Sequence, residues 1–358
     1  MKTQGINFLL LLIPVTGVLH AVGANQTWLF VSSALSIVPL SKLMGDVTET
    51  LSEYLGPTKG GFLNATLGNA PEIIISFFAL KAGLFEMVKC SITGSIIGNL
   101  LLGLGITFLS TAKGHLTRDV YFDLTASRVH SGLLVFALFG LIIPAVFDFS
   151  TTIDTEISLE ISVILIVVYV LAILTTFYPR VPHVPADDPL EIAHLEDESE
   201  GASSRWSQKT AVLVMGLVAV LLALMSDTMA NSIEPVTHGL GLTPSFVGVF
   251  VLALLGNVAE LTSAVRFARN DQIDLALGVL LGGSAQMAMM VAPTLVLMGA
   301  LLSFEMNLLF SIYDLVAVMM TVMAVSNFLS AGNFRPRVGI VFIAIYVMLG
   351  VGFFNMPA

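Results

Sequence analysis

Two carboxylates and two amides occupy matching places in two strongly apolar stretches of the sequence. The first stretch, GNAPEIIISFFAL, places Glu72 three residues after Asn69, and the second, GNVAELTSAVRFA, places Glu260 three residues after Asn257. This spacing brings an amide and a carboxylate to one face of a helix. An ionisable group inside a membrane is costly and by default indicates an ion path with a partner. The two stretches therefore predict an ion site in which the glutamates face each other through a cation.

Further oxygen ligands follow each motif. Ser95 and Asn99 are four residues apart after the first motif, and Ser284 and Gln286 follow the second. Carboxylate, amide and hydroxyl oxygens suit a hard cation such as Ca²⁺, and no His or Cys accompanies them to favour zinc or copper. Two negative charges balance one Ca²⁺. When the cation leaves, burial and mutual repulsion favour protonation of both carboxylates, so these residue types predict exchange of Ca²⁺ for H⁺.

The composition indicates a polytopic all-α membrane protein. Of the 358 residues, 56% are hydrophobic and 11% are charged, whereas about 25% are charged in an average soluble domain. No basic run indicates a nucleic-acid partner. Runs of about 20 apolar residues, enough to cross a bilayer, predict eleven helices, at 6–23, 25–41, 61–80, 84–110, 128–147, 157–178, 211–226, 244–265, 273–301, 306–327 and 338–355.

Two of these helices are expected to be longer than their apolar runs. Amphipathic stretches at 42–55 and 227–241 continue the second and the seventh run without an obvious breaker. The first run, 6–23, could also be a cleaved signal peptide, because Lys2 precedes it and small residues follow it. We interpret it as a retained helix.

The distribution of Lys and Arg predicts the orientation. If the polar loop 179–210 lies in the cytoplasm, every Lys and Arg except Lys81 and Lys89 lies there too, as the positive-inside rule requires. The N-terminus is then cytoplasmic. The short N-terminus and compact loops favour the plasma membrane of a prokaryote over a vacuole.

The two motifs belong to an internal repeat. A shift of 188 residues superposes one motif on the other: Gly68, Asn69 and Glu72 on Gly256, Asn257 and Glu260. The motifs lie five predicted spans apart, so the two copies cross the membrane in opposite directions. Such inverted repeats are typical of secondary transporters, whose ions bind near the membrane midplane beside broken helices.

The predicted organisation is one extra helix followed by two inverted five-helix halves. The extra helix occupies residues 1–24, the first half 25–178 and the second half 211–358, and an acidic linker, 179–210, joins the halves. Within the linker, residues 186–200 contain seven acids in fifteen positions. We interpret this stretch as a solvated linker. A cytoplasmic Ca²⁺ sensor is the alternative, although the ligand spacing and central Gly of an EF-hand loop are absent.

A break is expected in each motif helix, but the sequence supports the break in the first motif more strongly than the break in the second. Pro71 cannot donate a backbone hydrogen bond, and Gly68 next to it adds flexibility, so the first motif predicts an interrupted helix. The second motif has Ala259 where the first has proline. A break there would rest on Gly256 alone.

At these residues the chain resembles the cation/proton exchanger branch of the calcium/cation antiporter superfamily. That branch carries repeats of the kind GNATE…ALKKG…GSILSN and GNAAEH…LDIALGV…GSSTQ. Here they read GNAPEIIISFFALKAG followed by GSIIGN, and GNVAELTSAVRFARNDQIDLALGVLLGGSAQ. The resemblance covers nearly the whole chain. Three positions depart from the pattern: Pro71 replaces Thr, Leu261 replaces His and Ala285 replaces Thr.

The resemblance implies the roles of the motif residues. Glu72 and Glu260 would alternately bind Ca²⁺ and protons, with the second and seventh helices as sliding gates. Sodium-coupled relatives carry a Gly-Thr-Ser type of motif, so Gly-Asn here favours protons. The implied ion-binding set is Glu72, Glu260, Asn69, Asn257, Ser95, Asn99, Ser284 and Gln286.

The predicted function is secondary antiport, exporting cytoplasmic Ca²⁺ in exchange for H⁺. The expected partners are the lipid bilayer and the transported ions, with no other cofactor, and a homo-oligomer is compatible with the sequence. Na⁺/Ca²⁺ exchange, or exchange of another divalent cation, is the alternative within the class, and a Ca²⁺-permeable channel is the alternative outside it. An enzyme is not expected, because a nucleophile–base pair or metal motif for intramembrane hydrolysis is missing.

Overall fold

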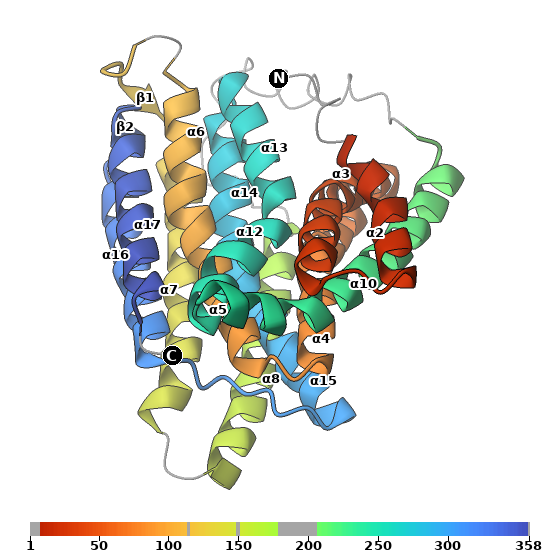
Figure 1. Cartoon of the computed structure of the whole chain (residues 1–358). Helices are drawn as coiled ribbons and strands as arrows, with labels where there is room; N and C mark the ends of the chain where they lie inside the picture. The colour runs from red at the N-terminus through yellow and green to blue at the C-terminus, as the bar shows by residue number, and fades with distance from the viewer. Residues whose placement is uncertain (1–7, 113–114, 148–150, 178–205, 357–358) are drawn as a thin grey trace, which may run out of the picture.

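The computed structural model describes residues 8–112, 115–147, 151–177 and 206–356, and within them the chain is almost entirely helical (Figure 1). The acidic stretch 186–200, with its two interpretations, lies outside the described residues. Up to the linker, the elements are η1 (Phe8–Leu11), α2 (Leu12–Ala21), α3 (Gln26–Leu67), α4 (Ala70–Lys81), α5 (Phe85–Ile97), η2 (Gly98–Gly103), α6 (Leu104–Ser110), β1 (Val120–Tyr121), α7 (Leu124–Val146) and α8 (Thr151–Phe177).

After the linker, the order of elements resembles that of the first half. The elements are α10 (Gln208–Leu240), α11 (Pro244–Phe246), η4 (Val247–Leu252), α12 (Ala253–Gly256), α13 (Val258–Arg269), α14 (Ile273–Gln286), η5 (Met287–Val291), α15 (Ala292–Leu302), α16 (Ile312–Leu329), β2 (Asn333–Phe334) and α17 (Val338–Phe354). The predicted all-α class of membrane protein is confirmed.

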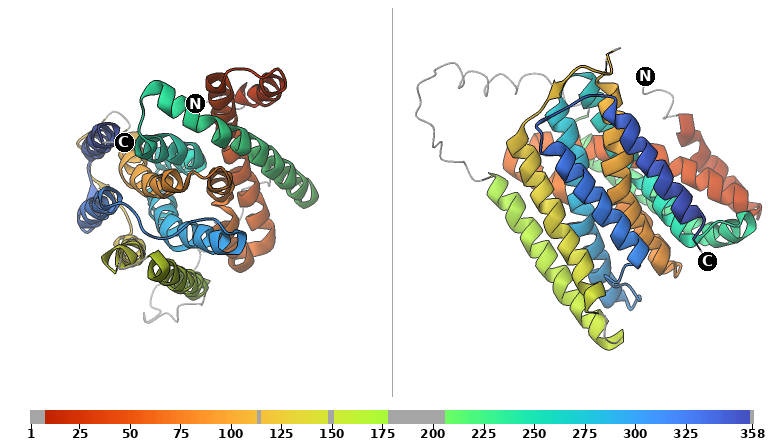
Figure 2. Two further views of the ribbon diagram at one scale, coloured as in Figure 1. Left: turned by 60° about the horizontal axis from the view of Figure 1, so that its bottom comes forward. Right: turned by 90° about the vertical axis from the view of Figure 1, so that its left-hand side faces the viewer.

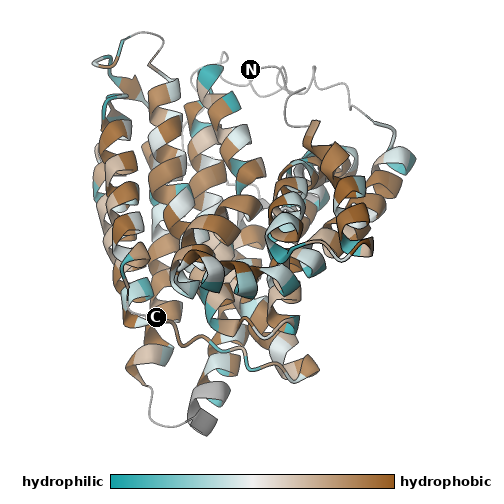
Figure 3. Cartoon of the chain, in the orientation of Figure 1, coloured by the Kyte–Doolittle hydropathy of each residue, from teal (hydrophilic) through white to brown (hydrophobic). Residues whose placement is uncertain are grey.

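The helices have the length and apolar character of membrane spans (Figure 3). Among the described residues, eight segments qualify as spans by length and composition, and the bent pair Pro244–Gly256 and Val258–Arg269 adds a ninth. Two shorter apolar helices, Phe8–Ala21 and Val338–Phe354, stand where the first and the last predicted spans were expected. At 1.5 Å per residue, α17 is about 26 Å long, less than the hydrocarbon core of about 30 Å. The predicted count of eleven is therefore not confirmed.

Two long helices, α3 and α10, pack against each other along one flank of the bundle (Figure 1 and Figure 2). Both extend beyond their apolar runs, α3 from Gln26 to Leu67 and α10 from Gln208 to Leu240, so the predicted extensions are confirmed. The backbone of α3 turns at Gly56, where φ is 77° and ψ is 175°. This left-handed conformation is readily adopted by glycine because it has no Cβ.

Both motif helices are broken at the asparagine. In the first motif, Asn69 has φ −100° and ψ 20° and precedes α4, with Pro71 in the first turn. In the second motif, Asn257 has ψ 2° between α12 and α13, and the two segments form an angle of 59°. The second break is present although proline is absent. The first motif remains part of one continuous span, Lys59–Lys81, so proline does not decide which copy bends more.

A short pair of antiparallel strands, which an all-α prediction does not include, joins the two halves at one end of the bundle. Val120 of β1 pairs with Phe334 of β2, and Tyr121 pairs with Asn333. The ring of Phe334 stacks on Phe108 of α6 with a centroid distance of 4.0 Å. The pairing thus links the loop after α6 to the loop before α17.

Glycine allows the closest helix contact in the centre of the bundle. A Cβ atom on Gly94 of α5 would overlap the backbone carbonyl of Val249 in η4. Small residues at helix interfaces permit such close backbone approach in membranes. On α14, Gly278 and Gly282 lie against the His130 ring of α7, so this histidine packs against a helix face.

We expect Gly94→Ala to destabilise the protein, because backbone atoms of η4 cannot move aside as a flexible side chain can. Overpacking of this kind costs about 1–3 kcal/mol, and the measurement is the midpoint of thermal unfolding in detergent. Gly132→Ala is the matched control, since nothing lies within 4 Å of a Cβ at that position. Equal midpoints for the two variants would contradict the close contact.

Candidate functional site

The two broken motifs meet in the centre of the bundle, where each asparagine is hydrogen-bonded to an amide of the other half. Asn69 Nδ2 donates to Gln286 Oε1. Asn257 Nδ2 donates to Asn99 Oδ1 at 3.1 Å and to the backbone carbonyl of Ser95 at 3.0 Å. These contacts are reciprocal: an amide side chain of α14 holds the first motif, and an amide side chain of η2 together with a backbone carbonyl of α5 holds the second.

Both supporting amides stand where an α-helix changes to a wider π-helical turn. Asn99 is the second residue of η2, which continues α5, and Gln286 is the last residue of α14 before η5 begins. Inserted π-helical turns are rare and occur frequently at functional sites. The wider turn changes the direction of the residues that follow it. The two halves thus use the same device at equivalent places.

The two carboxylates have different surroundings. Glu260 is half-buried, and its Oε2 accepts a hydrogen bond from Asn99 Nδ2. Glu72 is 7% exposed, and its Oε2 has no hydrogen-bond partner within the described residues. One carboxylate is therefore held by an amide, and the other is enclosed without a donor on one oxygen.

Two glycines provide the space in which the carboxylates lie. A Cβ on Gly256 would be 3.0 Å from Glu72 Cγ and 3.3 Å from its Oε1, and a Cβ on Gly283 would overlap the carboxylate of Glu260. Gly256 belongs to the second motif, so the second half also forms the wall against which the first carboxylate packs. Sequence reasoning treated Gly256 as a helix breaker and did not assign Gly283 a role. Its signal was the repeated glycine in GGSAQ.

Several oxygens of this cluster lack a hydrogen-bond donor. Within the described residues, the buried atoms without a partner include Asn69 Oδ1, Asn257 Oδ1 and Glu72 Oε2. Each asparagine uses its NH₂ group toward the other half, which leaves its oxygen free. Buried acceptors without a donor are destabilising, by about 1–3 kcal/mol each, and a hard cation satisfies them by ligation. The chemistry of the cluster therefore fits an oxygen-bound cation.

The structure places the predicted site residues unequally. Asn69 is hydrogen-bonded to Gln286, and Asn257 and Glu260 are each hydrogen-bonded to Asn99. The remaining three contribute differently: Glu72 through its contact with Gly256, Ser95 through its backbone carbonyl, and Ser284 through a hydroxyl that donates to the carbonyl of Leu280 in its own helix.

The donor set is poor in the groups that bind transition metals. The described residues contain no group of three or more His, Cys, Asp and Glu side chains that could hold a metal ion. The site instead has two carboxylates and amide oxygens. Such a set suits hard cations.

Comparison with known proteins identifies relatives along the whole chain. A family model described as sodium/calcium exchanger protein matches residues 25–178 and 210–354. The Ca²⁺/H⁺ antiporter of Synechocystis sp. is 35% identical over 373 residues, which cover 100% of this chain and 99% of that protein. The crystal structure of the Ca²⁺/H⁺ antiporter protein YfkE is 30% identical with a TM-score of 0.84 and covers 99% of this chain and 100% of that chain.

A more distant structure shares the fold. The H⁺/Ca²⁺ exchanger CAX has a TM-score of 0.71 at 14% identity and covers 98% of this chain and 91% of that chain. A helical bundle with broken helices and buried carboxylates at its centre is the arrangement of an ion-exchanging membrane transporter. This chain belongs to the sodium/calcium exchanger protein family. The resemblance to the cation/proton exchanger branch is confirmed.

Gly283→Ala tests the geometry around Glu260. We expect a strong loss of cation transport in proteoliposomes, because the added methyl group displaces the carboxylate. The thermal midpoint should change little, because the displaced atoms are the end of a flexible side chain.

The adjacent Gly282→Ala is the matched control for this experiment. A Cβ at Gly282 would lie 3.8 Å from the His130 ring, an ordinary van der Waals contact. If both variants transport like the original protein, Glu260 does not need the position that the structure gives it.

Proposed function

We propose that the protein is a Ca²⁺/H⁺ antiporter in which Glu72 and Glu260 alternately bind Ca²⁺ and protons. The observation that supports this most directly is the central cluster, where the buried Glu72 and the half-buried Glu260 stand beside amide oxygens that have no donor. Relatives that align with the full chain are named Ca²⁺/H⁺ antiporters. With Ca²⁺ bound, the two negative charges are neutralised, and without it protons neutralise them.

The ligand set in this proposal comprises the two glutamates, Asn69, Asn257, Asn99 and Gln286, with Ser95 and Ser284 in supporting places. The amide pairs orient the asparagines so that their oxygens are available to the ion. Asn99 also donates to Glu260 Oε2, so a cation or proton that binds to Glu260 competes with this hydrogen bond. In this way the carboxylate of one half is coupled to an amide of the other.

Alternating access would use α3 and α10 as the moving pair. They pack against each other, and each has an ion pair to the motif helix of the other half. Lys81, at the end of α4, lies 3.2 Å from Asp227 of α10, and Arg266 of α13 lies 3.7 Å from Glu49 of α3. Each ion pair stands near the C-terminal end of its motif helix. Because the two halves of the proposed repeat are inverted, the pairs would lie toward opposite sides of the membrane, and sliding of α3 and α10 would strain one while relaxing the other.

The proposed location is the plasma membrane of a prokaryote, with the N-terminus in the cytoplasm and the linker 179–210 on the same side. The asymmetry of Lys and Arg supports this orientation. The proposed division into residues 1–24, 25–178, 179–210 and 211–358 follows the repeat. In this orientation Ca²⁺ leaves the cell as H⁺ enters.

The proposal is tested with purified protein in liposomes that have an acid interior. We expect ⁴⁵Ca²⁺ uptake that requires the pH gradient, is indifferent to a sodium gradient, and falls to the level of protein-free liposomes in Glu72→Gln and Glu260→Gln. Each substitution removes a charge that Ca²⁺ and protons share. Uptake driven by sodium would indicate Na⁺/Ca²⁺ exchange, and uptake independent of both gradients would indicate a channel.

Glu156→Gln is the control for loss of a carboxylate as such. Glu156 is exposed and lies in α8, outside the cluster. Its variant should transport like the original protein. Normal exchange by Glu72→Gln or Glu260→Gln would refute the assignment of that glutamate as a carrier.

A further inference from the structure

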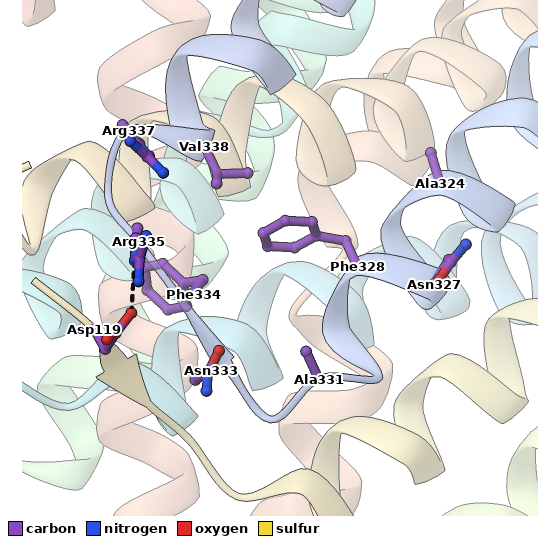
Figure 4. A pocket seen from close by; sticks show the side chains of 10 residues that line it. All are labelled: Asp119, Ala324, Asn327, Phe328, Ala331, Asn333, Phe334, Arg335, Arg337 and Val338. Atoms are coloured by element: carbon purple, nitrogen blue, oxygen red, sulfur yellow. Dashed lines mark hydrogen bonds and ion pairs between the residues drawn. The ribbon is translucent and has the colours of Figure 1, made fainter. Parts of the chain in front are cut away.

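A pocket opens at the end of the bundle where β1 and β2 pair, between the end of α16 and the start of α17 (Figure 4). Its volume is about 660 Å³. Asp119, Arg335 and Arg337 gather on one side, Asn327 lies on the other, and Phe328 and Phe334 lie between them (Figure 4). The pocket is distant in sequence from both motifs and has no place in ion exchange as described above.

The polar side of the pocket has an excess of positive charge. Arg335 Nε donates to Asp119 Oδ1 at 2.8 Å, and this ion pair raises the pKa of the Arg335 guanidinium. Arg337 is exposed and meets no carboxylate in the part of the chain that the structure describes. One guanidinium is thus neutralised and the other is available. Arg337 also stands directly before α17, whose N-terminal end carries a partial positive charge.

The pocket continues into apolar surface on both of its helices. On α16, Val316, Met320 and Met323 are exposed at helical spacing below Asn327, and on α17 Val341 and Met348 follow Arg337 in the same way. Met320 and Met323 are 61% and 63% exposed. In a membrane these side chains contact acyl chains. The pocket therefore lies where a positive group meets the start of two lipid-facing stripes.

A neighbouring pocket also contains a basic residue but does not combine an unpaired guanidinium with lipid-facing helix surfaces. That smaller pocket, about 310 Å³, is lined by Arg118, Asp119 and Asp271 among others. Arg118 lies 3.8 Å from Asp271, so its charge is compensated. No residue of the two lipid-facing stripes lines it.

We propose that the pocket between α16 and α17 binds an anionic phospholipid. The phosphate lies on Arg337, the amides of Asn327 and Asn333 provide further donors, and the acyl chains follow the apolar stripes of the two helices. Basic pockets between membrane helices are suited to lipid head groups, and guanidinium matches phosphate geometry with paired hydrogen bonds. The pocket's position at the ends of two lipid-facing helices favours a lipid phosphate over a soluble one.

The test measures lipid binding by the purified full-length chain, with native mass spectrometry as phosphatidylglycerol or phosphatidylcholine is titrated in. We expect preferential retention of phosphatidylglycerol, and an affinity about tenfold lower or more in Arg337→Gln, as for loss of a hydrogen bond to a charged group. Arg337→Lys keeps the charge without the planar fork and should lose less. Arg128→Gln is the matched control, since Arg128 is an exposed arginine near the start of α7 and does not line the pocket.

Four results would overturn the proposal. Phosphatidylcholine could bind as well as phosphatidylglycerol, or Arg337→Gln and Arg128→Gln could lose binding equally. Inorganic phosphate could raise the thermal midpoint by the same amount as phosphatidylglycerol in an Arg337-dependent way, which would identify a soluble-anion site. Size-exclusion chromatography of the same variants tests whether a second copy of the chain occupies the pocket instead. Loss of a dimer in Arg337→Gln alone would identify this face as a contact between copies and refute the proposed lipid site.

Discussion

The central constraint on this molecule is the burial of two carboxylates inside a bundle that lipid surrounds. Water is not available there to satisfy polar groups, so each must find its partner in the protein or in an ion. The reciprocal amide pairs, Asn69 with Gln286 and Asn257 with Asn99, meet this demand for the NH₂ groups while leaving oxygens free. The broken helices, the π-helical turns and the close glycine contacts all serve to bring these pairs together.

The two halves share a plan but not the same details. Glu260 is half-buried and bonded to Asn99, whereas Glu72 is buried against Gly256. The helix around the second motif is bent by 59°, and the first motif lies in a continuous span. A symmetric site would give the two carboxylates equal affinity for protons and cations. The difference in surroundings makes them chemically distinct although their motifs are alike.

Much of this arrangement was predictable from the sequence, because burial and charge leave strong patterns. The apolar runs predicted the helices, and the repeated Gly-Asn and Glu predicted a polar centre. The partners of the asparagines were not predicted, since a period of 3.6 residues locates a face of one helix and says nothing about which helix it meets. The sharper bend in the second motif, which has no proline, was also missed, because tertiary packing can override local propensity. The β1–β2 pair consists of only two residues on each side, too few to leave an alternating pattern.

The crossing of the amide pairs bears on how such a chain can arise and change. Each motif asparagine finds its amide partner in the other half, so a half-length protein would have to form an antiparallel dimer to build the same centre. The two subunits of such a dimer would have the same sequence. The amide that supports each motif would then be the same residue in both subunits, and so would the residue that precedes each motif glutamate. Fusion into one chain removes that identity. Pro71 in the place of Ala259, and a supporting amide at Asn99 in one half but one place earlier, at Gln286, in the other, are differences that two identical subunits could not have.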